Sequence, residues 1–354
     1  MRKIEIENIE NTKSEIIIQN GLIENIFDFL DENKRYFLIT NETIYKIYSK
    51  FLVNFEKNRI IVIKDGEKYK NFKTYNFIME KLLQEKIERK DSIVALGGGV
   101  VGDLAGFCAS TILRGVELIQ VPTTLLSMCD SSIGGKTGYN TKFGKNLIGS
   151  FYKAKKVLID SDFLKTLNEY EIKCGLGEVV KYAFIEKSCK AQDDFKLNKI
   201  LENLNLKTIF EKLDEIIYIC AFLKSNVVKL DEKEGNLRKI LNFGHTFAHP
   251  IETLSNYKNI SHGEAVALGM EIAFKVAKMQ GLIDENYFNY AISLMNNFSL
   301  LEKKRKFDKK KFLELMLQDK KVENKKINLL LPTSYLQVGL FDNISEPLLE
   351  ACLP

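Results

Sequence analysis

The stretch SIVALGGGVVGDLAGF, residues 92–107, joins an apolar run to a helical pattern through three consecutive glycines. The run SIVAL is typical of a β-strand, and Gly97-x-Gly99-x-x-Gly102 then forms a turn into a helix. Glycines at such a turn let the backbone approach a pyrophosphate, whose charge the helix N-terminus stabilises. The motif therefore predicts a nucleotide-binding turn in an α/β domain, although a tight turn that binds no ligand would fit the same residues.

The dinucleotide-binding fingerprint also has an acidic residue about 20 positions beyond its glycines. In this chain that residue would be Glu117, which falls inside the predicted strand VELIQV, residues 116–121. An acidic residue that binds a ribose is expected at the end of a strand. The ordinary fingerprint is therefore only half present.

Strands and helices alternate on both sides of the glycine turn. The sequence predicts strands at residues 36–40, 59–63 and 116–121, and apolar residues recur at helical spacing over residues 72–87. This alternation indicates a parallel sheet covered by helices. We therefore expect a Rossmann-like α/β nucleotide-binding domain over residues 1–160.

The pattern changes after residue 160. Long helical stretches dominate the rest of the chain, and only two short runs are extended. No Pro-, Gly- or Ser-rich linker separates the two halves. We expect a mainly α-helical domain over residues 161–354, packed against the first domain over a shared cleft; it contains the candidate metal- and substrate-binding residues described below. Its predicted helices are 162–187, 206–228, 263–281 and 308–318, and its extended runs are 327–331 and 335–341.

Composition excludes several classes of protein. With 45% hydrophobic and 28% charged residues and a net charge of +5 over 354 residues, the chain is typical of a globular protein that binds no nucleic acid. The basic cluster KKRKFDKKK, residues 303–311, indicates a solvated helix face. Six dispersed cysteines without C-x-x-C spacing favour reduced thiols. No signal peptide and no run of roughly 20 apolar residues is present, so we expect a soluble cytoplasmic protein without a membrane span.

Two polar stretches follow predicted strands. DGEKYK, residues 65–70, comes directly after one strand, and residues 120–146 begin at the end of another. Ligands of α/β folds bind at the carboxyl ends of parallel strands, and hydroxyl, amide and ammonium groups suit phosphates and sugars. We therefore interpret both stretches as functional loops. Their charged and amide side chains include Asp65, Glu67, Lys70, Asp130, Lys136, Lys145 and Asn146.

The three histidines of the chain, His245, His249 and His262, fall within 18 positions. Histidines four residues apart share a helix face, so spacing favours His245 and His249 as a metal-binding pair. Pro250 weakens that pair, because a residue before proline is pushed out of helical geometry. A catalytic zinc site needs a carboxylate as well and leaves one position open. The candidate carboxylates are Glu178, Glu252 and Glu264.

Taken together, these motifs resemble those of the 3-dehydroquinate synthase family, in the family's order and almost from end to end. The resemblance implies that Glu178, His245 and His262 bind zinc, with cobalt as an alternative, and that His249 faces the substrate. The chain departs from the family pattern at Ala248 and Pro250. The motifs are DGEKYK (65–70), GGGVVGDLAGF (97–107), VPTTLLSMCDSSIGGKTGYN (121–140), GKNLIGSFY (144–152), GLGEVVKYAFI (175–185), DEKEGNLRKILNFGHTFAHPIE (231–252) and SHGEAVALGM (261–270).

The activity that the resemblance implies is a step of the shikimate pathway, in aromatic amino acid biosynthesis. A phosphate-eliminating carbon–oxygen lyase of this family converts 3-deoxy-D-arabino-heptulosonate 7-phosphate to 3-dehydroquinate and phosphate. The implied reaction is a transient oxidation by NAD, phosphate elimination, reduction by the same cofactor and intramolecular aldol closure. The implied cofactors are NAD and zinc, and the implied partner is a small sugar phosphate.

The resemblance also assigns roles to individual residues. Implied NAD contacts are Asp65, Gly66, Glu67, Lys68, Tyr69, Lys70, Gly99, Val100, Val101, Gly102, Asp103, Thr123, Thr124, Lys136, Lys145, Phe163, Leu164, Lys165 and Thr166. Implied substrate contacts are Asp130, Lys136, Asn146, Lys181, Lys224, Arg238, Asn242 and His249, with either Lys320 or Lys321. Arg114 is similar to an arginine that reaches the phosphate site of a neighbouring subunit, which implies a homodimer.

Three other functions fit parts of the sequence. A metal-dependent polyol dehydrogenase would release NADH, but an uncharged polyol does not need so many cationic residues. A sister cyclase with an inositol-like or valiolone product would not need a carboxylate partner such as Arg238. A non-catalytic NAD-binding protein would have no use for two histidines and a glutamate that together make a metal site.

Overall fold

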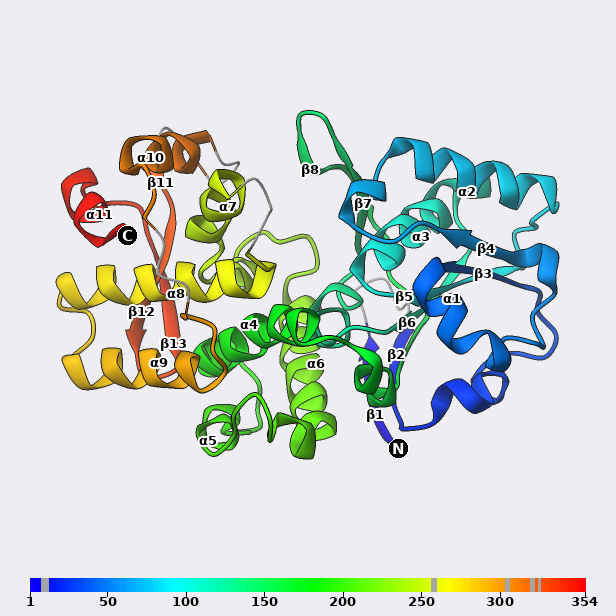
Figure 1. Cartoon of the computed structure of the whole chain (residues 1–354), viewed down its shortest axis with the longest axis horizontal. Coiled ribbons are helices and arrows are strands. Elements are labelled where there is room, and N and C mark those ends of the chain that lie inside the picture. The colour runs from blue at the N-terminus through cyan, green and yellow to red at the C-terminus, as the bar shows by residue number, and fades with distance from the viewer. Residues whose placement is uncertain (8–12, 256–259, 303–305, 319–321, 324–325) are drawn as a thin grey trace. The chain divides into compact units, whose positions relative to one another are not determined.

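The computed structural model describes the chain apart from residues 8–12, 256–259, 303–305, 319–321 and 324–325. The chain divides into two compact units, Met1–Leu167 and Asn168–Pro354. Figure 1 draws both, coloured from blue at the N-terminus to red at the C-terminus. Among the described residues, no helix combines the length and the apolar character needed to cross a membrane.

The first unit is built on a seven-stranded sheet in the order β1-β2-β9-β6-β5-β3-β4. β1 and β2 pair antiparallel at one edge, and all other neighbours are parallel. β5 is buried along its whole length, as expected for a central parallel strand covered on both faces. The strands are β1 (Arg2–Glu7), β2 (Lys13–Ile18), β3 (Tyr36–Asn41), β4 (Ile60–Ile63), β5 (Ser92–Gly97), β6 (Glu117–Pro122) and β9 (Lys156–Ile159).

Helices cover both faces of this sheet. The chain passes from β3 through α1 (Glu42–Tyr48) to β4, then returns through α2 (Phe72–Gln84) to β5 on the other side of β3. α3 (Gly99–Thr111) connects β5 to β6. Because parallel crossovers are right-handed, this reversal moves the helices to the opposite face. Figure 1 shows α1 on one side of the sheet and α2 and α3 on the other, so the topological switch point lies between β3 and β5.

The glycine turn follows β5 at this switch point. Gly102, in the first turn of α3, packs against Gln120 of β6, since a Cβ on Gly102 would lie 2.8 Å from Gln120 Oε1. Gln120 Nε2 also donates a hydrogen bond of 3.1 Å to the Gly102 carbonyl oxygen. The third glycine of the motif therefore lets the helix lie close to the neighbouring strand.

The position of Glu117 in the fold excludes it from the nucleotide-binding fingerprint. It is the first residue of β6 and lies opposite Ser92 at the amino ends of the parallel strands. Its carboxylate accepts hydrogen bonds from Ser92 Oγ at 3.0 Å and from Lys34 Nζ at 2.8 Å. A six-residue strand spans roughly 16 Å, which separates Glu117 from the glycine turn at the carboxyl ends.

Part of the predicted polar loop is regular structure. Residues 136–151 form an antiparallel hairpin of β7 (Lys136–Thr141) and β8 (Gly144–Phe151). Thr137 Oγ1 donates a hydrogen bond of 3.0 Å to the Ser150 carbonyl oxygen across the ladder, and β7 packs on α3. The loop prediction is therefore wrong for these residues, because turn-forming glycines and asparagines here join two short strands.

The second unit is mainly helical. α8, drawn in yellow in Figure 1, packs against α4, α7, α9 and β12 and forms the centre of the unit. Its buried side is rich in alanine and glycine, which lets neighbouring helices approach closely. The elements are α4 (Glu169–Ile185), α5 (Leu197–Glu202), α6 (Leu213–Leu230), α7 (His245–Leu254), α8 (His262–Met279), α9 (Glu285–Asn297), α10 (Lys309–Gln318), β10 (Val322–Glu323), β11 (Lys326–Ile327), β12 (Leu329–Ser334), β13 (Gln337–Phe341) and α11 (Glu346–Cys352).

These observations confirm the predicted fold class, a Rossmann-like α/β unit followed by a mainly helical one. The predicted helix at 263–281 is α8, and the predicted strand at 335–341 contains β13. The basic cluster is not one continuous helix face, because α10 begins only at Lys309. Residues 303–305 of that cluster lie outside the described part of the chain.

Candidate active site

In the first unit, four segments implied to bind NAD follow the carboxyl ends of parallel strands. The edge at which these strands end is where α/β folds bind nucleotides. The segments come from parts of the chain up to a hundred residues apart, and the sheet gathers them along one edge. They are Asp65–Lys70 after β4, Gly99–Asp103 after β5, Thr123 and Thr124 after β6, and Phe163–Thr166 after β9.

Hydrogen bonds and ion pairs connect these segments. The ammonium group of Lys70, which is 5% exposed, forms a short ion pair with the carboxylate of Asp103 in α3. Asn41 Nδ2, at the end of β3, donates a hydrogen bond of 2.5 Å to Asp65 Oδ1. No side chain caps the N-terminus of α3 at Gly98. The loop after β4 is therefore fixed to the neighbouring strand and helix, beside a helix N-terminus that has the charge to bind an anion.

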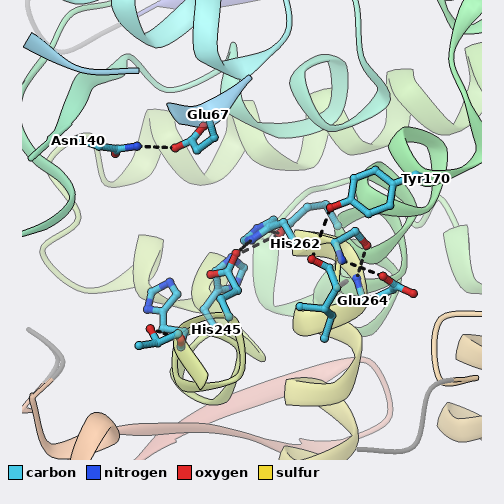
Figure 2. Close-up of polar contacts among 12 residues, drawn as sticks. Glu67, Asn140, Tyr170, His245, His262 and Glu264 are labelled. Atoms are coloured by element: carbon cyan, nitrogen blue, oxygen red, sulfur yellow. Dashed lines mark hydrogen bonds and ion pairs between the residues drawn. The ribbon is translucent and has the colours of Figure 1, made fainter. Parts of the chain in front are cut away.

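Asn140, which the sequence analysis does not single out, ties this loop to the β7–β8 hairpin. Its backbone N–H donates to the Lys70 carbonyl oxygen at 2.8 Å. Its side-chain Nδ2 donates to Glu67 Oε1 at 2.7 Å, as Figure 2 shows, and its Oδ1 accepts from the backbone N–H of Asn146 at 3.0 Å. One asparagine therefore connects a residue implied in NAD binding with a residue implied in substrate binding.

The other residues of the first unit implied to bind substrate or NAD lie in this hairpin or shortly before it in the chain. Asp130 lies in a single π-helical turn, Ser127–Ser131, which follows β6. Lys136 is exposed at the start of β7, and Lys145 and Asn146 are exposed on β8.

Arg114 lies elsewhere in the first unit. It is exposed, and it belongs to a turn in which three consecutive residues, Leu113, Arg114 and Gly115, have positive φ angles of 50°, 66° and 123°. This turn precedes β6 and so lies at the amino ends of the parallel strands, as Glu117 does. A non-glycine residue in the left-handed region costs on the order of 1 kcal/mol or more.

In the second unit, three ligand atoms converge. Glu178 Oε1 on α4 lies 3.3 Å from His245 Nε2 on α7 and 3.2 Å from His262 Nε2 on α8. All three ligand atoms lie within 4.8 Å of one another. Figure 2 shows the His245 and His262 rings turned toward the same place. Two imidazole nitrogens and one carboxylate oxygen are the donor set of a catalytic zinc site.

Close packing of two glycines brings two of these ligands together. A Cβ on Gly177 would lie 2.3 Å from the carbonyl oxygen of Gly263, and a Cβ on Gly263 would lie 2.3 Å from that of Cys174. Backbones can approach this closely only where both residues lack side chains. Gly177 precedes Glu178 and Gly263 follows His262, so the α4–α8 contact sets the separation of the two ligands. Neither glycine is among the residues predicted from the sequence, although both stand next to a candidate ligand.

The remaining nitrogens of the two histidines are also engaged. His245 Nδ1 lies 3.2 Å from the Phe243 carbonyl oxygen, and His262 Nδ1 lies 3.2 Å from Glu252 Oε1. Both rings therefore direct Nε2 toward Glu178.

The three candidate carboxylates have different partners. Glu178 faces both imidazoles, and Glu252 faces the outer nitrogen of His262. Glu264 accepts a hydrogen bond of 2.8 Å from the backbone N–H of Ser261, whose hydroxyl in turn accepts one of 3.2 Å from the Glu264 N–H. These two bonds form the capping box of α8. Of the three, Glu178 is the one whose carboxylate belongs to the group of converging ligand atoms.

Electrostatics favour an ionised Glu178. Its side chain is 1% exposed, and burial alone would raise its pKa, but Lys181 and His245 hold the pKa well below its usual range. Lys181 forms a short ion pair with Glu178 Oε2. Burial lowers the pKa of His245 to about 4, so this ring is neutral. Burial alone would lower the pKa of His262, but its hydrogen bonds to Glu178 and Glu252 raise that pKa to about 10. A carboxylate and a neutral imidazole are the protonation states that bind a metal, so the His262 ring would lose one proton when a metal binds.

His249 lies beside the cluster but outside it. Its ring centroid is 5.9 Å from that of His245, one turn along α7, and its side chain is half-buried. Pro250 does not end the helix, since α7 continues to Leu254. The expectation that Pro250 removes His249 from helical geometry is therefore wrong. In the structure, Glu178 meets His245 and a histidine of the next helix, not the pair of histidines that the spacing favours.

The cationic residues implied for the second unit lie on elements that pack together. Lys181 is on α4 and Lys224 is on α6, and the 3-10 turn Leu237–Asn242 contacts both helices. Arg238 is 2% exposed, and its Nη1 donates a hydrogen bond of 2.6 Å to the Glu232 carbonyl oxygen. Asn242 Nδ2 donates one of 2.8 Å to Glu234 Oε1. Lys320 and Lys321 lie outside the described residues.

Comparison with known proteins gives one family for nearly the whole chain. Residues 60–174 match the model of the 3-dehydroquinate synthase N-terminal domain, and residues 175–322 match that of the C-terminal domain. The 3-dehydroquinate synthase of Prochlorococcus marinus (strain AS9601) is 41% identical over 345 residues, which cover 94% of each chain. That of Alkaliphilus metalliredigens is 40% identical over 337 residues, covering 94% of this chain and 93% of the relative.

Solved structures share the fold at lower identity. A structure of 2-deoxy-scyllo-inosose synthase with carbaglucose-6-phosphate, NAD+ and Co2+ is 24% identical, covers 99% of this chain and 98% of its own, and superposes with a TM-score of 0.86. The 2-epi-5-epi-valiolone synthase of Streptomyces hygroscopicus, with NAD+ and Zn2+ bound, is 22% identical, covers 96% and 95% of the two chains, and has a TM-score of 0.83. At these identities the likeness concerns the fold alone.

Proposed function

The chain belongs to the 3-dehydroquinate synthase family, and on that premise we propose that it converts 3-deoxy-D-arabino-heptulosonate 7-phosphate to 3-dehydroquinate and phosphate. It is then a phosphate-eliminating carbon–oxygen lyase of the shikimate pathway. The convergence of Glu178, His245 and His262 is the observation that carries the proposal. It provides a site for a metal ion that would act as a Lewis acid. The other unit of the chain has the sheet edge of a dinucleotide-binding fold.

The residues present fit a divalent metal ion. Glu178 is an ionised carboxylate, and the Nδ1 atoms of His245 and His262 each face an oxygen acceptor, which leaves both Nε2 atoms for a ligand bond. These three residues would hold zinc, or cobalt in its place, and leave a coordination position open. When bound, such an ion polarises a substrate hydroxyl and so makes its proton easier to remove.

The residues of the first unit fit NAD. The uncapped N-terminus of α3 and the glycines before it suit a pyrophosphate, and the segments Asp65–Lys70, Thr123–Thr124 and Phe163–Thr166 would surround the rest of the cofactor. When bound, NAD accepts a hydride from the substrate alcohol and returns it later, so that no cofactor is consumed.

The remaining residues bind and orient an anionic sugar. A substrate with a carboxylate and a phosphate needs several cations, which Lys136, Lys181, Lys224 and Arg238 supply. Asp130, Asn146 and Asn242 contribute hydrogen bonds to its hydroxyl groups. The carbonyl formed by oxidation acidifies the neighbouring C–H bond, so the phosphate can leave. His249, half-buried one turn beyond His245, accepts or donates a proton beside the reacting hydroxyl.

The active enzyme is a homodimer in this proposal. Arg114 lies at the amino ends of the parallel strands, whereas the residues that would bind NAD lie at their carboxyl ends, roughly 16 Å away along β6. Within its own unit it cannot join the nucleotide loops. Its exposure and its left-handed backbone support a role toward another molecule, and we assign it to the phosphate site of a partner subunit.

The cytoplasm is the compartment that the cysteines favour. All six lie in the described part of the chain, and none forms a disulfide. Burial raises the pKa of Cys174 to about 12, which keeps this thiol protonated at neutral pH. Cysteines that form no disulfide are typical of a reducing compartment.

The decisive experiment is incubation of the zinc-loaded protein with the heptulosonate phosphate and NAD. We expect stoichiometric phosphate and 3-dehydroquinate, with no net rise in absorbance at 340 nm because the hydride is returned. The Glu178→Ala variant is the matched control and should release no phosphate. Accumulation of NADH in step with substrate loss would instead assign the chain to the polyol dehydrogenases. Turnover only of a sugar phosphate that lacks the carboxylate would assign it to the sister cyclases.

A further inference from the structure

We propose that Glu252 is a positioning residue that fixes the imidazole of His262 for metal binding. The inference rests on the proposed function only in taking a cation as the ligand of Glu178, His245 and His262. No comparison assigns a role to Glu252, and its sequence position makes it as good a candidate ligand as Glu178. Its contacts give it a different task.

Both nitrogens of the His262 ring face a carboxylate oxygen. Nδ1 lies 3.2 Å from Glu252 Oε1, and Nε2 lies 3.2 Å from Glu178 Oε1. A protonated ring can donate a hydrogen bond from each nitrogen, one to each carboxylate. A metal ion bound at Nε2 would take the place of the proton on that nitrogen. The remaining N–H, on Nδ1, would then donate to Glu252 and fix the orientation of the ring.

The position of Glu252 in the fold explains why it reaches only the outer nitrogen. It lies in the last turns of α7, seven residues after His245 and therefore roughly 10 Å further along the helix axis. α7 thus carries one ligand at its first residue and a support for the second ligand near its end. Glu252 is 7% exposed, so little water competes for its carboxylate. The contact joins α7 to the first residue of α8.

Glu264 is a control that the chain itself provides. It is also a glutamate, is also 7% exposed, and lies two residues from His262. Its carboxylate, however, bonds to the backbone of Ser261 in the capping box. Loss of Glu264 should therefore weaken the helix start without changing which ring nitrogen of His262 carries the proton.

The test is metal affinity, measured without substrate. Zinc and cobalt dissociation constants are determined by competition with a chromophoric chelator for the wild type and for Glu252→Ala, Glu252→Gln and Glu264→Ala. Removing the carboxylate that orients a metal-bound histidine typically weakens metal binding 10- to 100-fold, which we expect for Glu252→Ala. Glu252→Gln keeps an oxygen acceptor of the same shape and should recover part of the loss. Glu264→Ala should bind within about twofold of the wild type, although it unfolds at a lower temperature.

The cobalt form gives a second readout that a merely structural role would not change. The visible absorption bands of bound Co2+ report ligand geometry, and we expect them to shift in Glu252→Ala but not in Glu264→Ala. Circular dichroism confirms that each variant is folded at the temperature of the assay. A folded Glu252→Gln or Glu252→Ala protein with wild-type affinity and an unshifted cobalt spectrum would overturn the inference, as would a wild-type protein that retains no metal. A wild type that binds metal but releases no phosphate would overturn the proposed function and leave the role of Glu252 intact.

Discussion

The Gly177→Ala substitution tests whether the contact between α4 and α8 determines the metal site. The new Cβ would lie 2.3 Å from the Gly263 carbonyl oxygen and 2.4 Å from Gly263 Cα. Ordinary van der Waals contact begins at 3.4 Å, so the shortfall is 3.4 − 2.3 = 1.1 Å. The obstructing atoms belong to a helix backbone, which cannot rotate away as a side chain can. The helices must therefore separate by roughly 1 Å.

Two terms decide the loss of stability. Overpacking a well-packed contact costs typically 1–3 kcal/mol, and a shift of helix backbone belongs at the upper end of that range. Replacing glycine by alanine inside a helix gains up to about 1 kcal/mol. We expect a net loss of about 1–2 kcal/mol in the free energy of unfolding, which leaves a domain of ordinary stability folded.

The substitution should weaken metal binding more than it lowers the free energy of unfolding. Glu178 and His262 stand next to the two glycines, so a separation of roughly 1 Å is transmitted directly to their ligand atoms. Metal–ligand distances tolerate only about 0.2 Å of deviation. The expected result is a small loss of stability with a loss of zinc affinity of at least tenfold.

Urea denaturation of the metal-free protein and chelator competition measure the two effects separately. Gly235→Ala is the matched control, because its Cβ would meet only Asp231 Oδ1, at an ordinary 3.6 Å. It should change neither quantity measurably. If Gly177→Ala binds zinc as tightly as the wild type, the ligand geometry does not depend on the helix contact and the reasoning fails.

Three further predictions concern single residues. His262→Ala should lose metal and activity, whereas His249→Ala should lose activity and keep its metal; metal analysis of the purified variants with the opposite pattern would favour the helical pair. Mixing Arg114→Ala with Glu178→Ala subunits should restore about a quarter of wild-type activity, since half of the randomly exchanged dimers carry one complete pocket; confirmed exchange without recovery would remove Arg114 from the partner site. Asn140→Asp places a carboxylate against an acidic side chain of the nucleotide loop and keeps the acceptor for the hairpin. It should weaken NAD binding roughly tenfold, and an unchanged dissociation constant in calorimetry would contradict this.

The parallel strands at the core of the first unit can be predicted from the sequence, because they are short, apolar and bounded by turn residues. β5 and β6 are examples, since each ends where a glycine or proline interrupts the run. β1 is not among the predicted strands, although its alternation is visible in the sequence. Ile4 and Ile6 are buried, whereas Lys3 and Glu5 are exposed. This two-residue period is that of a strand with one covered face.

The candidate metal ligands are harder to predict, because sequence spacing describes one helix at a time. The spacing of His245 and His249 is correct for a shared face, and the two rings are close. Nothing in that spacing shows that Glu178 of α4 and His262 of α8 converge with His245. Likewise, the sequence does not separate Glu178 from Glu252, since the distinction depends on which nitrogen of a ring each carboxylate reaches.

The small residues of α8 link the packing of the second unit to its chemistry. Gly263 lets α4 approach, and Gly269 lets α7 approach, since a Cβ there would lie 2.1 Å from the Gly244 carbonyl oxygen. α4 carries Glu178 and α7 carries His245, so each glycine contact sets the position of a helix that holds a ligand. A metal ion bound by all three residues would in turn join α4, α7 and α8, and any ligand that binds only the folded state stabilises it. The glycines of SHGEAVALGM therefore set the separation of the helices that carry Glu178, His245 and His262, and a metal ion bound by these three residues would hold the same helices together.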